Sequence, residues 1–250
     1  MLRPRIIPCL LMQEGGLIKT KNFKNPKYVG DPINAVKIFN EKEVDELILL
    51  DIRAWADGGP NYKLLEKIAI ESRMPLCYGG GITNPEQALR IINMGYEKIS
   101  ISRAAMTSVN IIGDMASKIG SQSVVVTLDV RSDPHSDGYS IHTENGTRCL
   151  RHDLIDVCRR VMEMGAGELV INSIDLEGEM TGYDLPLAKM VAKEVSIPIT
   201  FIGGAGKLMD MAQLIKEVGV VGAGAGSMFV FKGPFRAVLI SYDRPQSLLF

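Results

Sequence analysis

Short apolar runs alternate with segments of helical periodicity along the whole chain. Near-continuous apolar runs are typical of parallel strands that are buried on both faces. The runs cover residues 5–11, 46–51, 76–78, 98–101, 123–129, 168–172, 199–202 and 220–223. Eight strands that alternate with helices predict an α/β protein of the (βα)8 or TIM barrel type.

The segments between these runs carry apolar residues at helical spacing. They cover residues 33–43, 61–72, 84–94, 107–119, 151–164, 184–195 and 207–218. The eighth helix is the exception, because residues 236–242 offer too short a segment for a full outer helix. An open, doubly wound sheet remains the alternative to a closed barrel.

An internal repeat favours the closed barrel. Gly79-Gly80-Gly81 and the helical segment 88–95 recur as Gly203-Gly204-Ala205 and the segment 212–219, at the same spacing from one another. A repeat of this kind predicts two ancestral halves, of about residues 1–120 and 121–250, within one barrel domain that spans residues 1–250. Chance similarity between glycine-rich αβ segments is the competing explanation.

Two insertions interrupt the alternation, each after the first strand of a predicted half. The first covers residues 13–30 and is expected to be a loop. The second covers residues 131–150, where segments 139–143 and 147–150 flank a turn at Glu144-Asn145-Gly146 and predict a hairpin. Long loops after barrel strands lie at the C-terminal face, where barrel enzymes build their active sites.

Composition excludes several classes of protein. The chain is 46% hydrophobic with a formal net charge of −1, which gives no basic surface for nucleic acid or anionic membranes. No apolar run is long enough to span a bilayer, and we expect a cytoplasmic protein. The four cysteines lack framework spacing and are expected to be reduced. With three histidines, neither a metal site nor a cofactor is expected.

Glycine-rich segments after four strands predict two phosphate cradles at the mouth. Backbone N–H groups of glycines can approach a phosphate closely, and a following helix N-terminus favours an anion. The predicted phosphate-binding residues are Gly81, Ser102 and Arg103 on one side, and Gly178, Gly204, Gly226 and Ser227 on the other. Glycines that serve only tight turns are the alternative. Two cradles imply an elongated ligand with a phosphate at each end.

Several motifs, taken in order, resemble a known family. They are Arg5-Ile-Ile-Pro-Cys-Leu10, Gly30-Asp-Pro32, Asp45-Glu-Leu-Ile-Leu-Leu-Asp51, Gly79-Gly-Gly-Ile82, Asn172-Ser-Ile-Asp175, Gly182-Tyr-Asp184 and Gly203-Gly-Ala-Gly-Lys207. Across about residues 3–231 the chain resembles the cyclase subunit of imidazole glycerol phosphate synthase (HisF). The resemblance implies a barrel that takes ammonia from a glutaminase partner through its axis and closes an imidazole ring on a nucleotide.

The resemblance breaks at the catalytic carboxylates. The family has one aspartate at the end of strand one and a second at the end of strand five; Asp129 matches the second, but Leu11 stands at the first position. Leucine cannot transfer a proton, and general acid–base groups contribute roughly 10²–10⁴-fold to rate. Glu14 is a candidate replacement. Asp51 is retained, although a carboxylate at a strand end can simply accept from loop N–H groups.

Four charged residues match those that ring the ammonia entrance in the family. They are Arg5, Glu46, Lys98 and Glu168, all at or near the starts of strands, so they should converge on the N-terminal face. Buried charges must pair, which two positive and two negative groups allow. The alternative to an ammonia gate is a structural plug.

The complete ring and the lost carboxylate together suggest retained ammonia delivery and altered chemistry. The chain looks like a surface-polysaccharide branch of the family, in which the barrel supplies ammonia for amidation of a nucleotide-linked sugar. The expected partners are a glutaminase, a phosphorylated or nucleotide-sugar ligand and a further amidotransferase. The alternatives are an ordinary histidine-pathway cyclase and a non-catalytic scaffold that activates the glutaminase.

Overall fold

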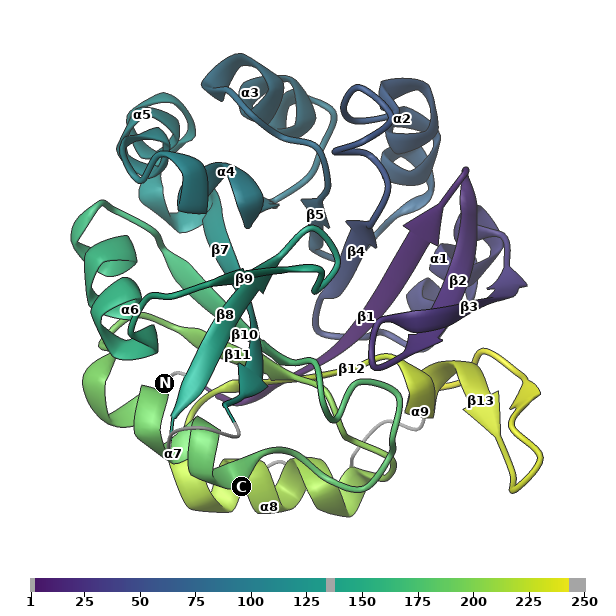
Figure 1. Cartoon of the computed structure of the whole chain (residues 1–250). Helices are drawn as coiled ribbons and strands as arrows, with labels where there is room; N and C mark the ends of the chain where they lie inside the picture. The colour runs from purple at the N-terminus through teal and green to yellow at the C-terminus, as the bar shows by residue number, and fades with distance from the viewer. Residues whose placement is uncertain (1–2, 134–137, 243–250) are drawn as a thin grey trace.

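Eight parallel strands close into a barrel in the computed structural model, which describes residues 3–133 and 138–242 (Figure 1). The barrel strands are β1 (Arg5–Gln13), β4 (Leu47–Asp51), β5 (Leu76–Gly79), β6 (Lys98–Ile101), β7 (Val124–Ser132), β10 (Glu168–Ser173), β11 (Ile199–Ile202) and β12 (Gly222–Ala225). Pairing of β12 with β1 and of β6 with β7 joins the two halves of the chain, and pairing of β7 with β10 completes the closed barrel. The predicted TIM barrel is therefore confirmed.

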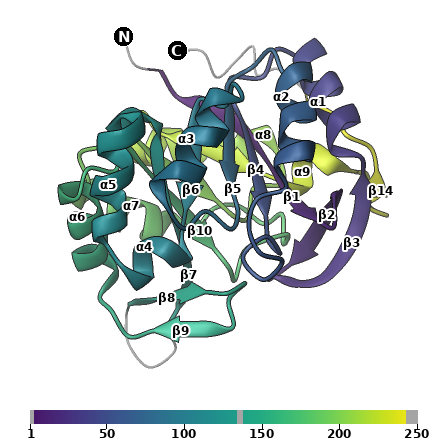
Figure 2. The same cartoon turned by 90° about the horizontal axis from the view of Figure 1, so that it is seen from above.

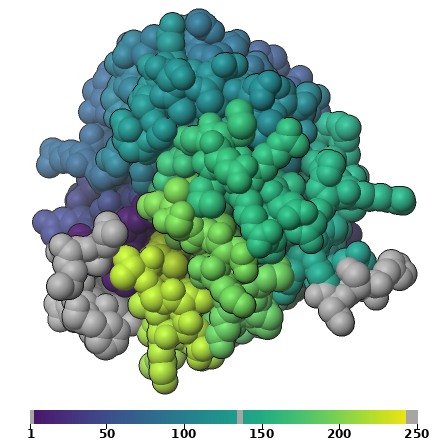
Figure 3. All heavy atoms as spheres, turned by 90° about the vertical axis from the view of Figure 1, so that its left-hand side faces the viewer, coloured from purple at the N-terminus to yellow at the C-terminus, as the bar shows by residue number. Residues whose placement is uncertain are grey.

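Helices surround the barrel and pack against the outer faces of the strands. They are α1 (Pro32–Glu41), α2 (Tyr62–Glu71), α3 (Pro85–Asn93), α4 (Arg103–Thr107), α5 (Asn110–Ile119), α6 (Leu154–Glu163), α7 (Leu185–Glu194), α8 (Leu208–Val218) and α9 (Ser227–Val230), with a 3-10 turn η1 (Ser121–Ser123). In the space-filling view of Figure 3, residues of the first half of the sequence cover the upper part of one side and residues of the second half the lower part.

Local sequence explains where most of these helices begin. The side chains of Asp31, Asn61, Asn84, Asp153 and Asp184 each accept a hydrogen bond from a backbone N–H in the first turn of the following helix. Such N-caps satisfy donors that would otherwise lack partners at a helix start. The βα connections are thus fixed by short polar residues in the loops.

Both insertions form hairpins rather than irregular loops. The expectation of a loop at residues 13–30 is wrong, because β2 (Gly16–Lys21) pairs antiparallel with β1 and β3 (Lys24–Gly30) pairs antiparallel with β2. The predicted hairpin in the second insertion is confirmed as β8 (Tyr139–Thr143) and β9 (Arg148–Leu150), which project from the barrel (Figure 2). Each barrel half therefore begins with a long strand and a hairpin, while the ancestral duplication itself stays a prediction.

A full eighth helix is absent at 236–242, as the short segment predicted: the four-residue α9 is followed there by the hairpin of β13 (Phe231–Lys232) and β14 (Ala237–Val238). Two predicted boundaries are wrong. The segment 107–119 is split into α4 and α5. The eighth strand is Gly222–Ala225 instead of 220–223, because Val220 is exposed and the strand consists of glycine and alanine. The apolar signal of Val220 therefore misplaced the strand.

The barrel interior holds a separate apolar layer. This layer lies within the ring of strands and is separate from the larger core between strands and helices. Its residues are Ile7, Cys9, Ile48, Cys77, Val125, Val170 and Ile202. All four cysteines are free thiols, three of them buried, as expected. Across residues 3–133 and 138–242, every helix is too short or too polar to cross a membrane.

Gly222→Ala should destabilise the barrel, because a methyl group at this position would overlap the Thr200 hydroxyl on the neighbouring strand. Overpacking of this kind costs about 1–3 kcal/mol. Gly113→Ala is the matched control: its new methyl group would lie 3.5 Å from its nearest neighbour atom, the Met164 carbonyl oxygen, so the fold has room for it. Because alanine favours a helix, that change should stabilise α5 by roughly 0.5–1 kcal/mol. Urea unfolding midpoints that move in the same direction for both variants would contradict this account of the strand.

Candidate functional site

A cavity of about 640 Å³ opens at the C-terminal end of the barrel, among loops that follow β4, β5, β6 and β7. Its lining brings together several of the predicted residues. Leu11, Asp51, Gly81, Ser102, Arg103 and Asp129 all contribute to it. The residues of the first predicted cradle therefore share one cavity with Asp51 and Asp129.

Leu11 and Asp129 face one another across this mouth. Three strands separate β1 from β7 in either direction around the barrel, so the two residues lie on opposite walls. Leu11 continues the inward-facing positions of Ile7 and Cys9, and Asp129 continues that of Val125, since side chains alternate along a strand. The apolar side chain thus occupies the position opposite the carboxylate.

Asp129 lies in an environment that disfavours its charge. Burial raises the pKa of this carboxyl to about 6, and a hydrogen bond of 2.8 Å donated by the Asn172 amide opposes the shift. The side-chain oxygen of Asn172 is buried without a hydrogen-bond partner, and both residues line the cavity. A carboxyl with a pKa near neutrality can both accept and donate a proton under ordinary conditions.

The second predicted cradle lines a separate, narrow pocket of about 30 Å³. Gly178, Gly204, Gly226 and Ser227 all contribute to it, together with Leu11 and Asn172. The Ser227 hydroxyl is buried there and has no hydrogen-bond partner among the described residues. An unsatisfied donor at this position suits a ligand oxygen, but the helix that follows has only four residues and contributes little dipole.

The sequence analysis missed a buried ion pair in this pocket. Lys19 on β2 pairs with Glu177, and both side chains are only 6% exposed. Burial lowers the pKa of Lys19 to about 8. The available signal was a lysine within the strand-like run Gly16–Lys21, but that run had been assigned to a loop.

The first cradle differs from its prediction in what its residues contact. A methyl group on Gly81 would meet the Ala54 carbonyl at 2.8 Å, so this glycine packs against the loop after β4. Arg103 begins a helix of five residues, and its guanidinium pairs with Glu144 at 3.2 Å. The Asp51 carboxylate accepts hydrogen bonds from the Arg53 and Ala54 N–H groups, so it holds the loop.

Glu14 lies away from the site. It occupies the turn between β1 and β2 with a φ of 52°, and its side chain is exposed. Its neighbour Gln13 lines the cavity, whereas Glu14 lines neither pocket. The geometry therefore gives no support to Glu14 as a replacement for the missing aspartate. Across the described parts of the chain, no group of three or more potential metal ligands is present.

The four predicted ring residues meet at the opposite end of the barrel. Arg5 donates to Glu46 at 2.5 Å and to Glu168 at 2.7 Å, while the Lys98 ammonium lies 2.9 Å from an oxygen of each glutamate. The Thr200 hydroxyl adds a hydrogen bond of 2.6 Å to Glu168. The ring is closed, and each carboxylate bridges both cations.

The two carboxylates of the ring differ in their affinity for a proton. Burial, together with the like charge of Glu168, raises the pKa of Glu46. Burial also opposes ionisation of Glu168, but the hydrogen bond and charge of Arg5, with Lys98 and Thr200, outweigh it and lower that pKa. Glu168 is therefore the firmly ionised member of the ring.

Comparisons with known proteins agree with the resemblance read from the sequence. The family model described as "Histidine biosynthesis protein" matches residues 5–236. A protein of Leptospira borgpetersenii named "Putative imidazole glycerol phosphate synthase subunit HisF" is 51% identical over 97% of this chain and 96% of its own length. The protein of the same name from Leptospira interrogans is 50% identical over 98% and 97%. The imidazole glycerol phosphate synthase subunit HisF of Petrotoga mobilis is 36% identical over 92% and 91%.

Asp129→Asn should change how stability depends on pH. The folded state holds the Asp129 proton up to about pH 6, whereas the unfolded state releases it near pH 4, so the free energy of unfolding falls as pH rises through this window. The shift corresponds to at most about 3 kcal/mol, since part of the side chain faces the cavity. The variant should therefore gain stability over the natural chain between pH 4 and pH 8.

Urea unfolding at both pH values measures this gain. The exposed Asp114→Asn on α5 makes the same chemical change away from the site. A difference between Asp129→Asn and the natural chain that stays constant with pH would contradict the raised pKa.

Proposed function

Since the chain belongs to the HisF family of imidazole glycerol phosphate synthase subunits, we propose that its barrel receives ammonia at the charged ring and delivers it to an acceptor at the opposite mouth. The observation that carries this proposal is the complete ring of Arg5, Glu46, Lys98 and Glu168. Burying four charges is expensive, and apolar residues of similar size could close a barrel end at no greater cost. A purely structural plug would not need this arrangement.

The barrel interior above the ring suits ammonia rather than ammonium. Ile7, Ile48, Val125 and Val170 form an apolar layer between the ring and the mouth. A neutral molecule crosses such a layer more readily than an ion, whose desolvation is costly. Ammonia must therefore come from a source that releases it at the ring, and a glutaminase docked over the N-terminal face is the partner that the names of the relatives suggest.

Of the carboxylates Asp51, Asp129 and Glu144 that line the cavity, Asp129 is the one that we assign to proton transfer, because Asp51 holds its own loop and Glu144 pairs with Arg103. Asp129, with a pKa of about 6, is suited to take the proton that nitrogen loses when it adds to an acceptor. Leu11 offers no second proton-transfer group on the opposite wall. We therefore infer that the imidazole-forming reaction, which in this family uses two carboxylates, is not the main activity of the chain.

A phosphorylated, nucleotide-linked sugar is the acceptor class that we propose. The cavity is large enough for such a ligand; the Asn172 amide lines it, and the buried Ser227 hydroxyl lies in the adjoining narrow pocket, which Asn172 also lines. A further amidotransferase could complete the transfer.

Cyclase activity should be at least about 10²-fold slower than that of a relative with both aspartates, because Leu11 removes one of two acid–base groups. The measurement is formation of imidazole glycerol phosphate from the histidine-pathway nucleotide and ammonium. Leu11→Asp alone should not restore the full rate, since Ser102-Arg103 and the loop after the first strand also depart from the pattern of the family. If this chain forms imidazole glycerol phosphate at a rate within a few-fold of that of the two-aspartate relative, it is an ordinary cyclase.

Lys98→Ala should uncouple glutamine hydrolysis from use of the ammonia. The change removes one of the two cations of the ring and leaves Arg5 to balance both Glu46 and Glu168, at a cost of up to about 3–5 kcal/mol if burial is complete. The measurement is glutamine consumed per acceptor aminated in the complex with glutaminase, with free ammonium as the bypass. Lys67→Ala, an exposed lysine on α2, is the matched control.

Tight coupling in Lys98→Ala would identify the ring as a structural plug. Stimulation of the glutaminase without transfer of nitrogen to any acceptor would instead identify a scaffold.

A further inference from the structure

The one tryptophan of the chain lies at the cavity rather than in the core. Trp55 belongs to the loop after β4, lines the cavity and is 38% exposed. Burying an indole in the core would remove far more apolar surface from water than this position does. An aromatic ring left partly exposed inside a ligand-sized cavity is a surface on which another planar group can stack.

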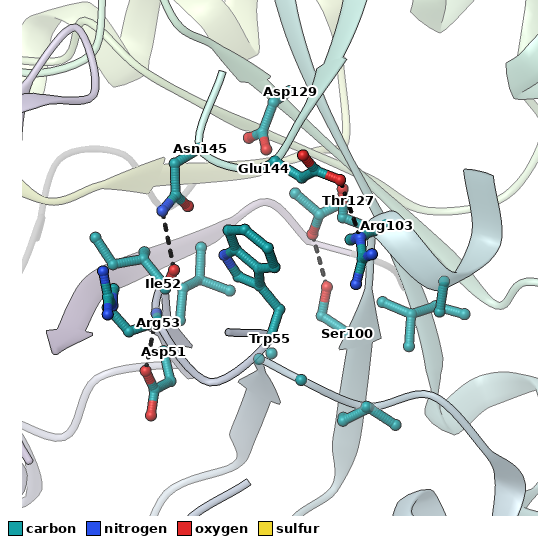
Figure 4. A pocket seen from close by; sticks show the side chains of 18 of the residues that line it. Asp51, Ile52, Arg53, Trp55, Ser100, Arg103, Thr127, Asp129, Glu144 and Asn145 are labelled. Carbon is teal, nitrogen blue, oxygen red and sulfur yellow. Dashed lines mark hydrogen bonds and ion pairs between the residues drawn. The ribbon is translucent and has the colours of Figure 1, made fainter. Parts of the chain in front are cut away.

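Arg103 and Glu144 border this indole. The Arg103 guanidinium lies 5.3 Å from the Trp55 ring centre, and Glu144 pairs with Arg103 at 3.2 Å (Figure 4). The two ion-pairing side chains are 48% and 24% exposed. Because exposed ion pairs contribute little to stability, a ligand anion can replace Glu144 on the guanidinium without large cost.

The three side chains come from three segments that meet over the mouth. Trp55 follows β4, Arg103 begins α4 after β6, and Glu144 is in the turn of the β8–β9 hairpin. The neighbouring Asn145 donates a hydrogen bond of 3.0 Å to the Ile52 carbonyl and ties the hairpin to the loop that carries Trp55. The tip of the hairpin therefore holds the carboxylate over Arg103.

We propose that Trp55, Arg103 and Glu144 form a subsite for the nucleotide part of the acceptor. The base stacks on the Trp55 indole, and a phosphate of the ligand replaces the Glu144 carboxylate on Arg103. Stacking of bases on aromatic side chains is strong and tolerates different bases, and a guanidinium binds phosphate in a bidentate manner. This assignment rests on the proposed function, since it takes the acceptor to be nucleotide-linked.

A simple phosphate site would not need this construction. An anion cradle requires donors alone, whereas here the cation is placed beside an aromatic ring and is covered by a competing carboxylate. The Gly81 side of the predicted cradle packs against Ala54 and leaves Arg103 as the main anion-binding group. An aromatic ring beside a cation favours a ligand that carries both a planar ring and a negative charge over a ligand that carries only the charge.

Binding can be followed directly, because the fluorescence of the single tryptophan reports this site alone. The probes are uridine diphosphate and adenosine diphosphate, with inorganic pyrophosphate and glucose 1-phosphate as probes that lack a base. We expect saturable quenching by the nucleoside diphosphates, at concentrations about tenfold or more below those required for pyrophosphate. Calorimetry repeats the measurement for variants that lack the indole.

The variants separate the two interactions. Trp55→Leu should abolish the preference for a base while leaving pyrophosphate binding unchanged, and Trp55→Phe should retain part of the preference. Arg103→Gln should weaken every phosphate-containing probe about tenfold, whereas Glu144→Gln should tighten them by removing the competing carboxylate. Arg160→Gln, which removes one positive charge from the outer helix α6, is the matched control.

Equal affinity for pyrophosphate and nucleoside diphosphates would overturn the subsite, as would equal affinity for glucose 1-phosphate or a Glu144→Gln variant that binds more weakly. These results leave ammonia delivery untouched, because coupling at Lys98 is measured at the other end of the barrel. Conversely, if nucleoside diphosphates bind better than pyrophosphate but Lys98→Ala stays tightly coupled, the subsite stands and the proposed ammonia delivery is wrong.

Discussion

A ring of four charges at one end of the barrel, three buried and one partly buried, constrains the register of the barrel strands. Arg5, Lys98 and Glu168 begin three different strands and Glu46 directly precedes a fourth, and each charge is acceptable only because its partners are within hydrogen-bonding distance. The register of the barrel strands must therefore be correct for any of them to be paired. The small residue at Gly222 belongs to the same constraint, since it leaves room for Thr200 to bond Glu168.

At the opposite end of the barrel, a carboxyl group and an apolar side chain face one another across the mouth. Asp129 retains a carboxyl whose charged form is disfavoured by burial, while Leu11 across the mouth has none. A carboxyl kept at a raised pKa reduces stability at neutral pH, which is a cost typical of functional positions. Among the described residues, the side-chain oxygen of the neighbouring Asn172 has no hydrogen-bond partner, so this wall offers polar groups to the cavity, whereas Leu11 offers only an apolar surface.

Sequence reasoning predicted elements well and contacts poorly. Apolar runs and the helical spacing of apolar residues located the strands and helices, because burial of one face sets a pattern among residues that are close in the chain. Val220 misled the assignment of the eighth strand, since only the position of the adjacent β11 reveals that glycines are required there. The pairing of Lys19 with Glu177 was missed for a similar reason: the two residues are far apart in sequence and meet only through the fold of the first hairpin.

The sequence by itself determined the barrel, because alternating apolar runs and helical segments fix its strands. It also placed four charged residues at or near strand starts, where parallel strands bring them to one face, and an apolar Leu11 near the end of the first strand. The tertiary structure alone decided which loops cover the mouth. It placed Glu144 on Arg103 and set both beside Trp55, although nothing in the local pattern of any of these segments specifies the others. The physical reason is that side chains along a strand alternate in a fixed way, whereas contacts between loops depend on how the closed barrel brings their tips together.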